Sequence, residues 1–143
     1  MSFGIEAVLF PVFVQVGITF FLLFWTARLR IAALRGGEVS FDDIALRQPA
    51  WPERPTQVAN AFHNQLELPL LFYVLVILAL FTRKADTLFL ILAWMFVATR
   101  LVHAAIHVTS NDMRRRFQAF AVGAVLLLIM WIIFALRLLF AGL

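Results

Sequence analysis

The sequence predicts an all-α integral membrane protein, built as an antiparallel bundle of four transmembrane helices. Of its 143 residues, 64% are hydrophobic and only 14% are charged, and the mean hydropathy is +0.95. A soluble domain of this length could not bury so much apolar surface, whereas a domain in lipid has no need to bury it. The apolar residues also gather in four runs, each close to the roughly 20 residues that a helix needs to cross a bilayer.

The chain is expected to form one membrane domain over residues 1–143. The predicted spans cover about 7–27, 56–81, 86–108 and 117–139, and a long loop, 28–55, joins the first two. These runs are too long and continuous for strands, and helices satisfy their own backbone hydrogen bonds in lipid. Arg83-Lys84 predicts a tight turn after the second span, and Gly36-Gly37 predicts a helix stop inside the long loop.

The basic residues predict the orientation of the bundle. Arg28, Arg30, Arg35, Arg47, Arg54, Arg114, Arg115 and Arg116 fall in the two loops on one side, against Arg83, Lys84 and Arg137 on the other. The positive-inside rule places the richer side in the cytoplasm and both termini outside. These residues form no pattern that reads nucleic acid. The absence of cysteine excludes a protein thiolate nucleophile, thiolate metal ligands and disulfides.

Two polar stripes lie at the same depth near the cytoplasmic ends of the second and third spans. The first consists of Asn60, His63, Asn64 and Glu67, and the second of Arg100, His103 and His107. Helical spacing puts each set on one face, and Pro69 predicts a kink just beyond Glu67. A charge facing lipid at the centre of a span costs about 2.5–3.5 kcal/mol. The stripes are therefore expected to face each other, a partner subunit or a water-filled cavity, with Glu67 and Arg100 as an ion pair.

Other interpretations of these residues stay open. The polar stripes could only fix helix register, as polar contacts do in many membrane bundles. Arg114, Arg115 and Arg116 are typical of topology anchors, and Arg28 and Arg30 of side chains that snorkel to the interface. His103 and His107, with His63 and Glu67 at the same spacing, could hold a metal ion, but Arg100 would repel it and no metal motif is complete. No residue is therefore assigned to a metal.

The sequence resembles the MAPEG family, the membrane-associated proteins in eicosanoid and glutathione metabolism. Asn64-Gln65-Leu66-Glu67 entering the second span, Thr26-Ala27-Arg28-Leu29-Arg30 leaving the first, and the stretch from Thr99 to Arg116 carry the resemblance. The family includes microsomal glutathione transferases, leukotriene synthase and microsomal prostaglandin E synthase. The resemblance implies a homotrimer with glutathione between adjacent subunits near the cytoplasmic surface. The chain looks like a bacterial member, which implies the inner membrane.

The resemblance also implies roles for the polar residues. Asn64 and Glu67 would hold polar groups of glutathione, Arg28 and Arg100 would neutralise its carboxylates, and Arg116 would stabilise its thiolate as the catalytic residue. A free thiol with a pKa near 8.5 is mostly protonated at neutral pH, and a guanidinium favours the anion.

Two positions depart from the family pattern. Asn60 and His107 stand where eicosanoid members have an arginine and a tyrosine. Each loses a glutathione contact of the family. Asn60 is still expected at the ligand site, and His103 and His107 are expected to contact the ligand differently or to transfer a proton.

The expected function is therefore that of a glutathione-dependent transferase or peroxidase acting on a hydrophobic electrophile. Its expected partners are membrane lipid, glutathione or a similar anionic thiol, a hydrophobic small molecule and two further copies of the chain, with no nucleic acid. The alternative is a non-catalytic protein that binds lipid or another small molecule on the same scaffold. A metal site on the histidines and Glu67 is the third possibility.

Overall fold

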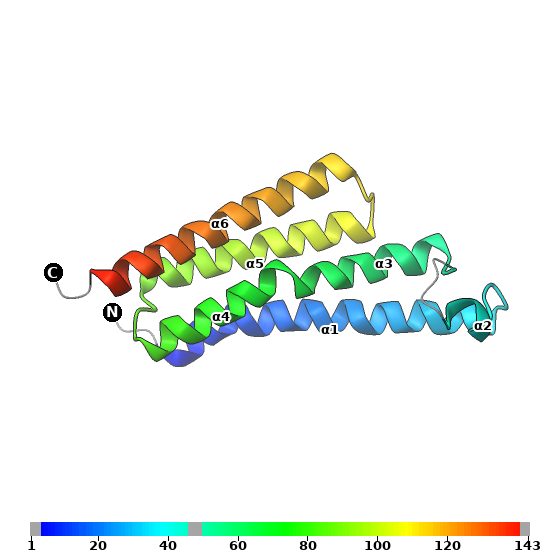
Figure 1. Cartoon of the computed structure of the whole chain (residues 1–143), viewed down its shortest axis with the longest axis horizontal. Coiled ribbons are helices and arrows are strands. Elements are labelled where there is room, and N and C mark those ends of the chain that lie inside the picture. Colours follow the sequence, from blue (N-terminus) through cyan, green and yellow to red (C-terminus); the bar gives the residue numbers. More distant parts are fainter. Residues whose placement is uncertain (1–3, 46–49, 141–143) are drawn as a thin grey trace.

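The computed structural model describes residues 4–45 and 50–140, and it is helical in all its regular elements (Figure 1). These are α1 (Ile5–Arg35), α2 (Phe41–Ile44), α3 (Glu53–His63), the 3₁₀ turn η1 (Asn64–Leu66), α4 (Leu68–Phe81), α5 (Thr87–Val108) and α6 (Met113–Leu139). Four segments are long and apolar enough to cross a membrane, namely Ile5–Arg35, Glu53–Phe81, Thr87–Val108 and Met113–Leu139. The predicted four-helix membrane bundle is confirmed.

The helices extend further than the apolar runs at the end where the arginines gather. α1 continues through Arg28 to Arg35 and is capped by Gly36, with Gly37 in the left-handed region at φ 71°. The loop expected over 28–55 thus begins at Gly36, where the glycine pair predicted a stop, and it contains α2. A charge ends an apolar run but not a helix, because arginine is a good helix former. Of the basic residues expected in this loop, Arg47 lies outside the described residues.

The second span is broken near its middle. α3 ends at His63, η1 follows, and Glu67 has the irregular angles φ −96° and ψ −101° before α4 starts at Leu68. Pro69 explains the break, because it has no N–H to donate and its ring would clash with the carbonyl four residues earlier. The kink was expected just beyond Glu67, but the α-helical geometry is already lost at Asn64. Figure 1 shows the step between α3 and α4.

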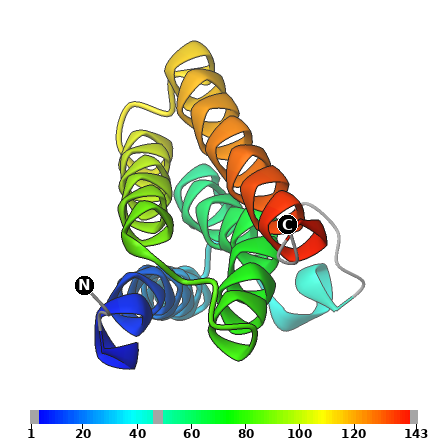
Figure 2. The ribbon, with the colours of Figure 1, turned by 90° about the vertical axis from the view of Figure 1, so that its left-hand side faces the viewer.

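The four spans run alternately up and down (Figures 1 and 2). α3 packs between α1 and α5, α4 packs against α1 and α6, and α5 and α6 form a hairpin. α2 and the turn between α5 and α6 lie at one end, which we call the basic end because Arg35, Arg54 and Arg114–Arg116 gather there. The half of the bundle away from that end, the apolar half, contains a continuous core. Its buried residues are Val8, Phe72, Leu75, Val76, Ala79, Phe89, Ala93, Phe96, Val97, Leu127, Met130 and Phe134.

Candidate functional site

Arg100 is the largest fully buried side chain of the described residues, with 0% of its surface exposed. Its Nη2 donates a hydrogen bond to the backbone oxygen of Asn64 at 3.0 Å, and its guanidinium carbon lies 5.8 Å from the centroid of the Phe120 ring. The Nε and Nη1 atoms have no hydrogen-bond partner. Gly123 allows α6 to approach α5 beside Arg100, since a Cβ there would lie 2.7 Å from Thr99 Oγ1. Arg100 therefore fills the junction of α5, α6 and η1.

The expected ion pair between Glu67 and Arg100 is not formed. Glu67 is exposed, and Arg137–Asp86 is the only salt bridge among the described residues. Glu67 continues the exposed face that carries Asn60 and His63, so its carboxylate lies on the surface of the chain. Arg100 meets the Asn64 carbonyl that the loss of α-helical geometry leaves available. The prediction was wrong because it assumed that the polar face of the second span turns toward α5.

His103 and His107 extend the buried stripe that begins with Arg100. They are 3% and 2% exposed, their rings lie 5.8 Å apart edge to face, and the His103 ring lies 6.0 Å from that of Phe120. The Nδ1 atoms of both histidines are buried without a partner. The interior of the bundle therefore contains a guanidinium and two imidazoles with unused hydrogen-bonding atoms.

The stripe on the second span does not face this cluster from within the same chain. Asn60, His63 and Glu67 are exposed, and Asn64 is half-buried with its Nδ2 donating to the Asn60 backbone oxygen at 2.9 Å. α3 and η1 instead bury the opposite face, which carries Val58, Ala61 and Gln65. Of the three expected arrangements, the two stripes do not face each other within one chain, and contact with a partner subunit or a water-filled cavity stays a prediction. Apolar packing decides which face of α3 turns inward.

A groove of about 300 Å³ lies on the outer surface between α1 and α3, next to these exposed residues. Arg30, Thr26 and His63 contribute polar groups to its lining. The Arg30 guanidinium lies 4.8 Å from the centroid of the Trp51 ring, while Arg30 Nε and Thr26 Oγ1 are buried without partners. Arg28, also on α1, is exposed. Sequence reasoning did not single out Thr26, whose hydroxyl could have been noticed only once the α1–α3 contact was known.

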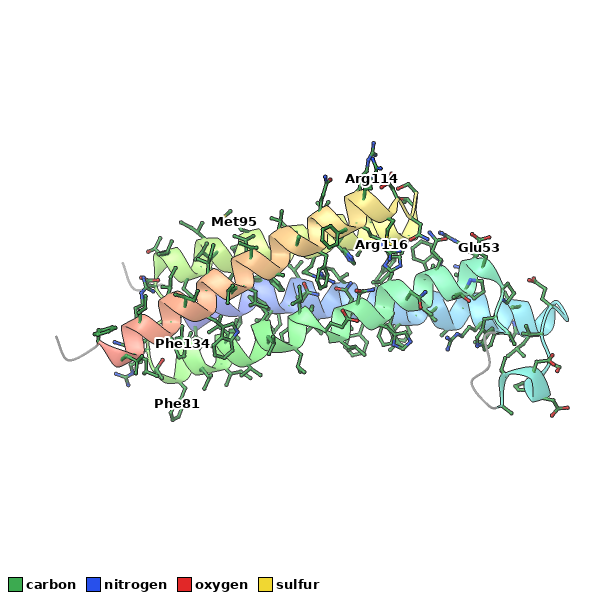
Figure 3. All side chains as sticks on the ribbon, turned by 45° about the horizontal axis from the view of Figure 1, so that its top comes forward. Glu53, Phe81, Met95, Arg114, Arg116 and Phe134 are labelled. Atoms are coloured by element: carbon green, nitrogen blue, oxygen red, sulfur yellow. The ribbon has the colours of Figure 1, made fainter. Side chains whose placement is uncertain are left out.

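Arg116 lies in the first turns of α6, on the side that faces the bundle. Figure 3 shows its side chain directed toward α3, while that of Arg114 points away. Arg116 is half-buried and donates from Nη1 to Oδ1 of Asn111. Phe120, which contacts Arg100 and His103, is four residues further along the same face of α6. Arg116 thus lies near the buried cluster of Arg100, His103 and His107.

Buried amides near the cluster were missed by sequence reasoning. Gln15 donates from Nε2 to Oε1 of Gln65 at 2.9 Å, and Gln65 Nε2 donates to the backbone oxygen of Ala61 at 3.1 Å. At the basic end, Gln57 Nε2 donates to the His107 oxygen at 2.7 Å, and Arg54 donates to the oxygen of Val108. An amide inside the uncharged first span was a usable signal for Gln15, since such groups need a partner in lipid.

The rival metal site is not assembled within the part of the chain that the structure describes. There, no group of three or more His, Cys, Asp and Glu side chains is arranged to hold a metal ion. His63 and Glu67 are exposed on the second span, whereas His103 and His107 are buried on α5. The chain therefore does not bring together the four residues whose spacing suggested a metal.

Comparison with known proteins gives one match. The sequence profile of the MAPEG family matches residues 8–136. No curated protein and no solved structure matches the chain. The matched range includes the four spans almost entirely and every residue of the candidate site, from Arg28 to Arg116.

Proposed function

The chain belongs to the MAPEG family, and we propose that it is a membrane-bound, glutathione-dependent transferase or peroxidase that acts on a hydrophobic electrophile. The observation that carries this proposal is the state of Arg100. Its guanidinium is fully buried inside a membrane bundle, and its one hydrogen bond goes to a neutral carbonyl. A buried charge without a counter-ion is strongly unfavourable, and ionisable residues inside membranes are usually functional.

The chemistry of the buried cluster fits an anion and not a cation. Arg100, His103 and His107 present N–H donors or imidazole nitrogens, and no carboxylate of the described residues lies within salt-bridge distance of Arg100. Glutathione carries two carboxylates and a thiol, so it would supply the counter-charge that Arg100 lacks within salt-bridge distance. Asn64 lies directly beside Arg100 and would hold polar groups of the same ligand.

The exposed polar residues support a site completed by a neighbouring subunit. Arg28, Asn60 and Glu67 lie on the surface of α1 and the second span, and Glu67 stands near the middle of the segment Glu53–Phe81. A charge facing lipid at that depth would cost about 2.5–3.5 kcal/mol. We therefore propose a homotrimer in which the next subunit covers this face and glutathione lies at the border. The basic end would face the cytoplasm of a bacterial cell, following the positive-inside rule.

Arg116 is the residue proposed to act on the reacting group. The chain has no cysteine, so bound glutathione supplies the thiol. A half-buried guanidinium beside that thiol favours its ionised form, which is the nucleophile. His103 and His107 have free Nδ1 atoms with which to hold or move a proton. The hydrophobic second substrate would enter from the lipid.

Thermal unfolding of the detergent-purified protein, with and without glutathione, tests the proposal through Arg100→Leu. If Arg100 serves a ligand, the variant should be as stable as the wild type or more stable without glutathione, because an uncompensated buried charge is removed. It should also lose the stabilisation by glutathione, which at 100 times Kd is about 2.7 kcal/mol. A structural role for Arg100 predicts the reverse, a large loss of stability without ligand.

Arg83→Asn is the matched control. It removes an arginine at the opposite end of the bundle, where φ is 56° and asparagine is tolerated, and it should leave the response to glutathione intact. Arg116→Ala should retain binding but lower turnover of an aryl halide electrophile. Absence of glutathione stabilisation in the wild type would contradict the proposal. Saturable binding without turnover of aryl halides or hydroperoxides would support the non-catalytic alternative.

A further inference from the structure

The α5–α6 hairpin carries a second hollow, on its outer side near the basic end. This groove has a volume of about 470 Å³. One wall comes from Ala98, Thr99 and Val102 of α5, and the other from Arg115, Ala119 and Val122 of α6. Arg115, Ala119 and Val122 are spaced i, i+4 and i+7, so they follow one face of the helix. Each wall includes an alanine, Ala98 on α5 and Ala119 on α6, whose small side chains leave space in the groove.

The wall of the groove is apolar along most of its length. Thr99 donates its hydroxyl to the backbone oxygen of Phe96 at 2.7 Å, so its hydrogen is already used. Val102 and Val122 are each 53% exposed and have no protein neighbour covering them in the single chain. From Arg115 to Val122 the groove extends over about 10 Å of helix. It thus leads from the boundary of the membrane into the hydrocarbon region.

The mouth of the groove is cationic. Arg115 and Gln118 line it, and both are exposed. Within the described residues no carboxylate forms a salt bridge with Arg115. Asp112 instead uses its Oδ1 to accept the backbone N–H of Arg115 at 2.9 Å. The charge of the side chain therefore remains available at the level where lipid headgroups begin.

We propose that this groove binds an anionic phospholipid of the surrounding membrane. One acyl chain lies against Val102, Ala119 and Val122, and the phosphate-containing headgroup is held by Arg115 and Gln118. The groove opens to lipid at the depth of acyl chains, and basic residues at the cytoplasmic side of a bundle select anionic headgroups. The proposal does not depend on glutathione binding, because Arg100 and Phe120 belong to the inner face of the same hairpin.

Native mass spectrometry of the detergent-purified protein, mixed with equal amounts of phosphatidylglycerol and phosphatidylcholine, tests this proposal. The wild type should retain phosphatidylglycerol about fivefold more than phosphatidylcholine, as expected for one arginine at a membrane surface. Arg115→Gln should abolish the preference. Arg114→Gln is the matched control, since that side chain points away from the bundle (Figure 3), and it should keep the preference.

Two further variants distinguish lipid binding in the groove from general attraction of anionic lipid to the basic residues. Ala119→Leu fills the groove from α6, and Val102→Trp fills it from α5, so both should lower the binding of either lipid several-fold. If Arg114→Gln and Arg115→Gln lose the preference for phosphatidylglycerol equally, the groove is not the binding site. The lipid is then attracted by the basic residues in general. Binding unchanged in both filling variants would place the lipid elsewhere. Competition by inorganic phosphate would show that the site takes free phosphate and not a lipid.

Discussion

The two halves of the bundle differ in what their helices bury. The apolar half is filled by aliphatic and aromatic side chains, with Phe72 and Phe96 stacked at 4.8 Å between ring centroids. The half at the basic end has a smaller apolar cluster, made of Leu22, Val58, Ala61, Ala104 and Val108. It also buries Gln15, Thr26, Gln65, Arg100, His103 and His107. Both halves lie within the same four spans, so their difference reflects two tasks within one membrane domain.

The comparison shows where the stability of the fold should reside. In lipid, helices are held together by close packing, since hydrocarbon surrounds both the associated and the separated helices. The apolar half provides that packing and, among the described residues, leaves no buried side-chain nitrogen or oxygen without a partner. The basic half instead buries Arg100, His103 and His107 with atoms that lack partners, which favours ligand binding over stability. Truncation of a buried apolar side chain in the apolar half should therefore lower stability, whereas replacement of Arg100 by leucine in the basic half should not.

The largest expected loss follows from Phe72→Ala in the apolar half. Phe72 is 0% exposed, so truncation leaves a cavity beside Phe96 and should lower the free energy of unfolding by about 3–5 kcal/mol. Unfolding in mixed micelles of rising dodecyl sulfate concentration measures this loss. Phe81→Ala is the control, because Phe81 is 86% exposed and should change stability by less than about 0.5 kcal/mol. Equal losses in both variants would refute a core concentrated in this half.

A smaller loss is expected from Gly123→Ala, at the border between the halves. The added Cβ would lie 2.7 Å from Oγ1 of Thr99, so α6 must move away from α5 at a cost of about 1–3 kcal/mol. Thr99→Ala in the same chain should recover most of the loss, which a double-mutant cycle measures. Gly17→Ala adds a methyl where nothing lies within 4 Å and should cause no loss. A cycle without coupling would exclude this contact as the cause.

Much of the fold could be predicted from the sequence, because the signals for it are local. Four apolar runs predicted the spans, Gly36-Gly37 predicted the end of α1, and Pro69 predicted a break in the second span. The helix ends were less predictable. Arg28 and Arg30 end an apolar run without ending a helix, so the structure continues α1 to Arg35.

The candidate site was predicted only in part, because it depends on which helix face turns inward. The spacing of Arg100, His103 and His107 identified one face of α5, and the structure buries it. On α3 the polar stripe and the stripe of Val58, Ala61 and Gln65 have similar spacing, so the sequence alone does not decide between them. Burial of the face that carries Val58, Ala61 and Gln65 also turns Gln65 toward Gln15. The Gln15–Gln65 hydrogen bond joins two different spans, so no local sequence pattern predicts which two residues pair.

Gln15→Leu should have a moderate effect on the basic half. It removes the 2.9 Å hydrogen bond to Gln65, and such bonds between membrane helices contribute about 0.6 kcal/mol on average. The variant should lose about that much in the unfolding assay, because Gln65 keeps its bond to the Ala61 carbonyl. Gln15→Leu with Gln65→Leu should regain the loss. A deficit above about 2 kcal/mol would mean that this pair, and not the apolar half, holds α1 to the second span.

The smallest effect should come from the charged pair of Asp86, which caps α5, and Arg137, in the last turn of α6, next to the apolar half. Asp86 accepts hydrogen bonds from Arg137 at 2.8 Å and from the Phe89 N–H at 2.9 Å. Partial burial raises the pKa of Asp86, but the hydrogen bonds and the charge of Arg137 outweigh it and hold the pKa below its ordinary value of 3.8. The stabilisation is therefore present above pH 3.8 and lost as pH falls through the lower pKa of the folded state.

The pair is worth little at any pH, because the side chain of Asp86 is 51% exposed and solvent screens it. We expect a contribution of a few tenths of a kcal/mol, or about 0.5 kcal/mol at most. Asp86→Asn keeps the ability to cap α5, so its difference from the wild type isolates the charge. In urea unfolding that difference should be constant near neutral pH and vanish once the pH falls below the lowered pKa of Asp86 in the folded state. A difference that persisted in acid would assign the stabilisation to the cap and not to the pairing with Arg137.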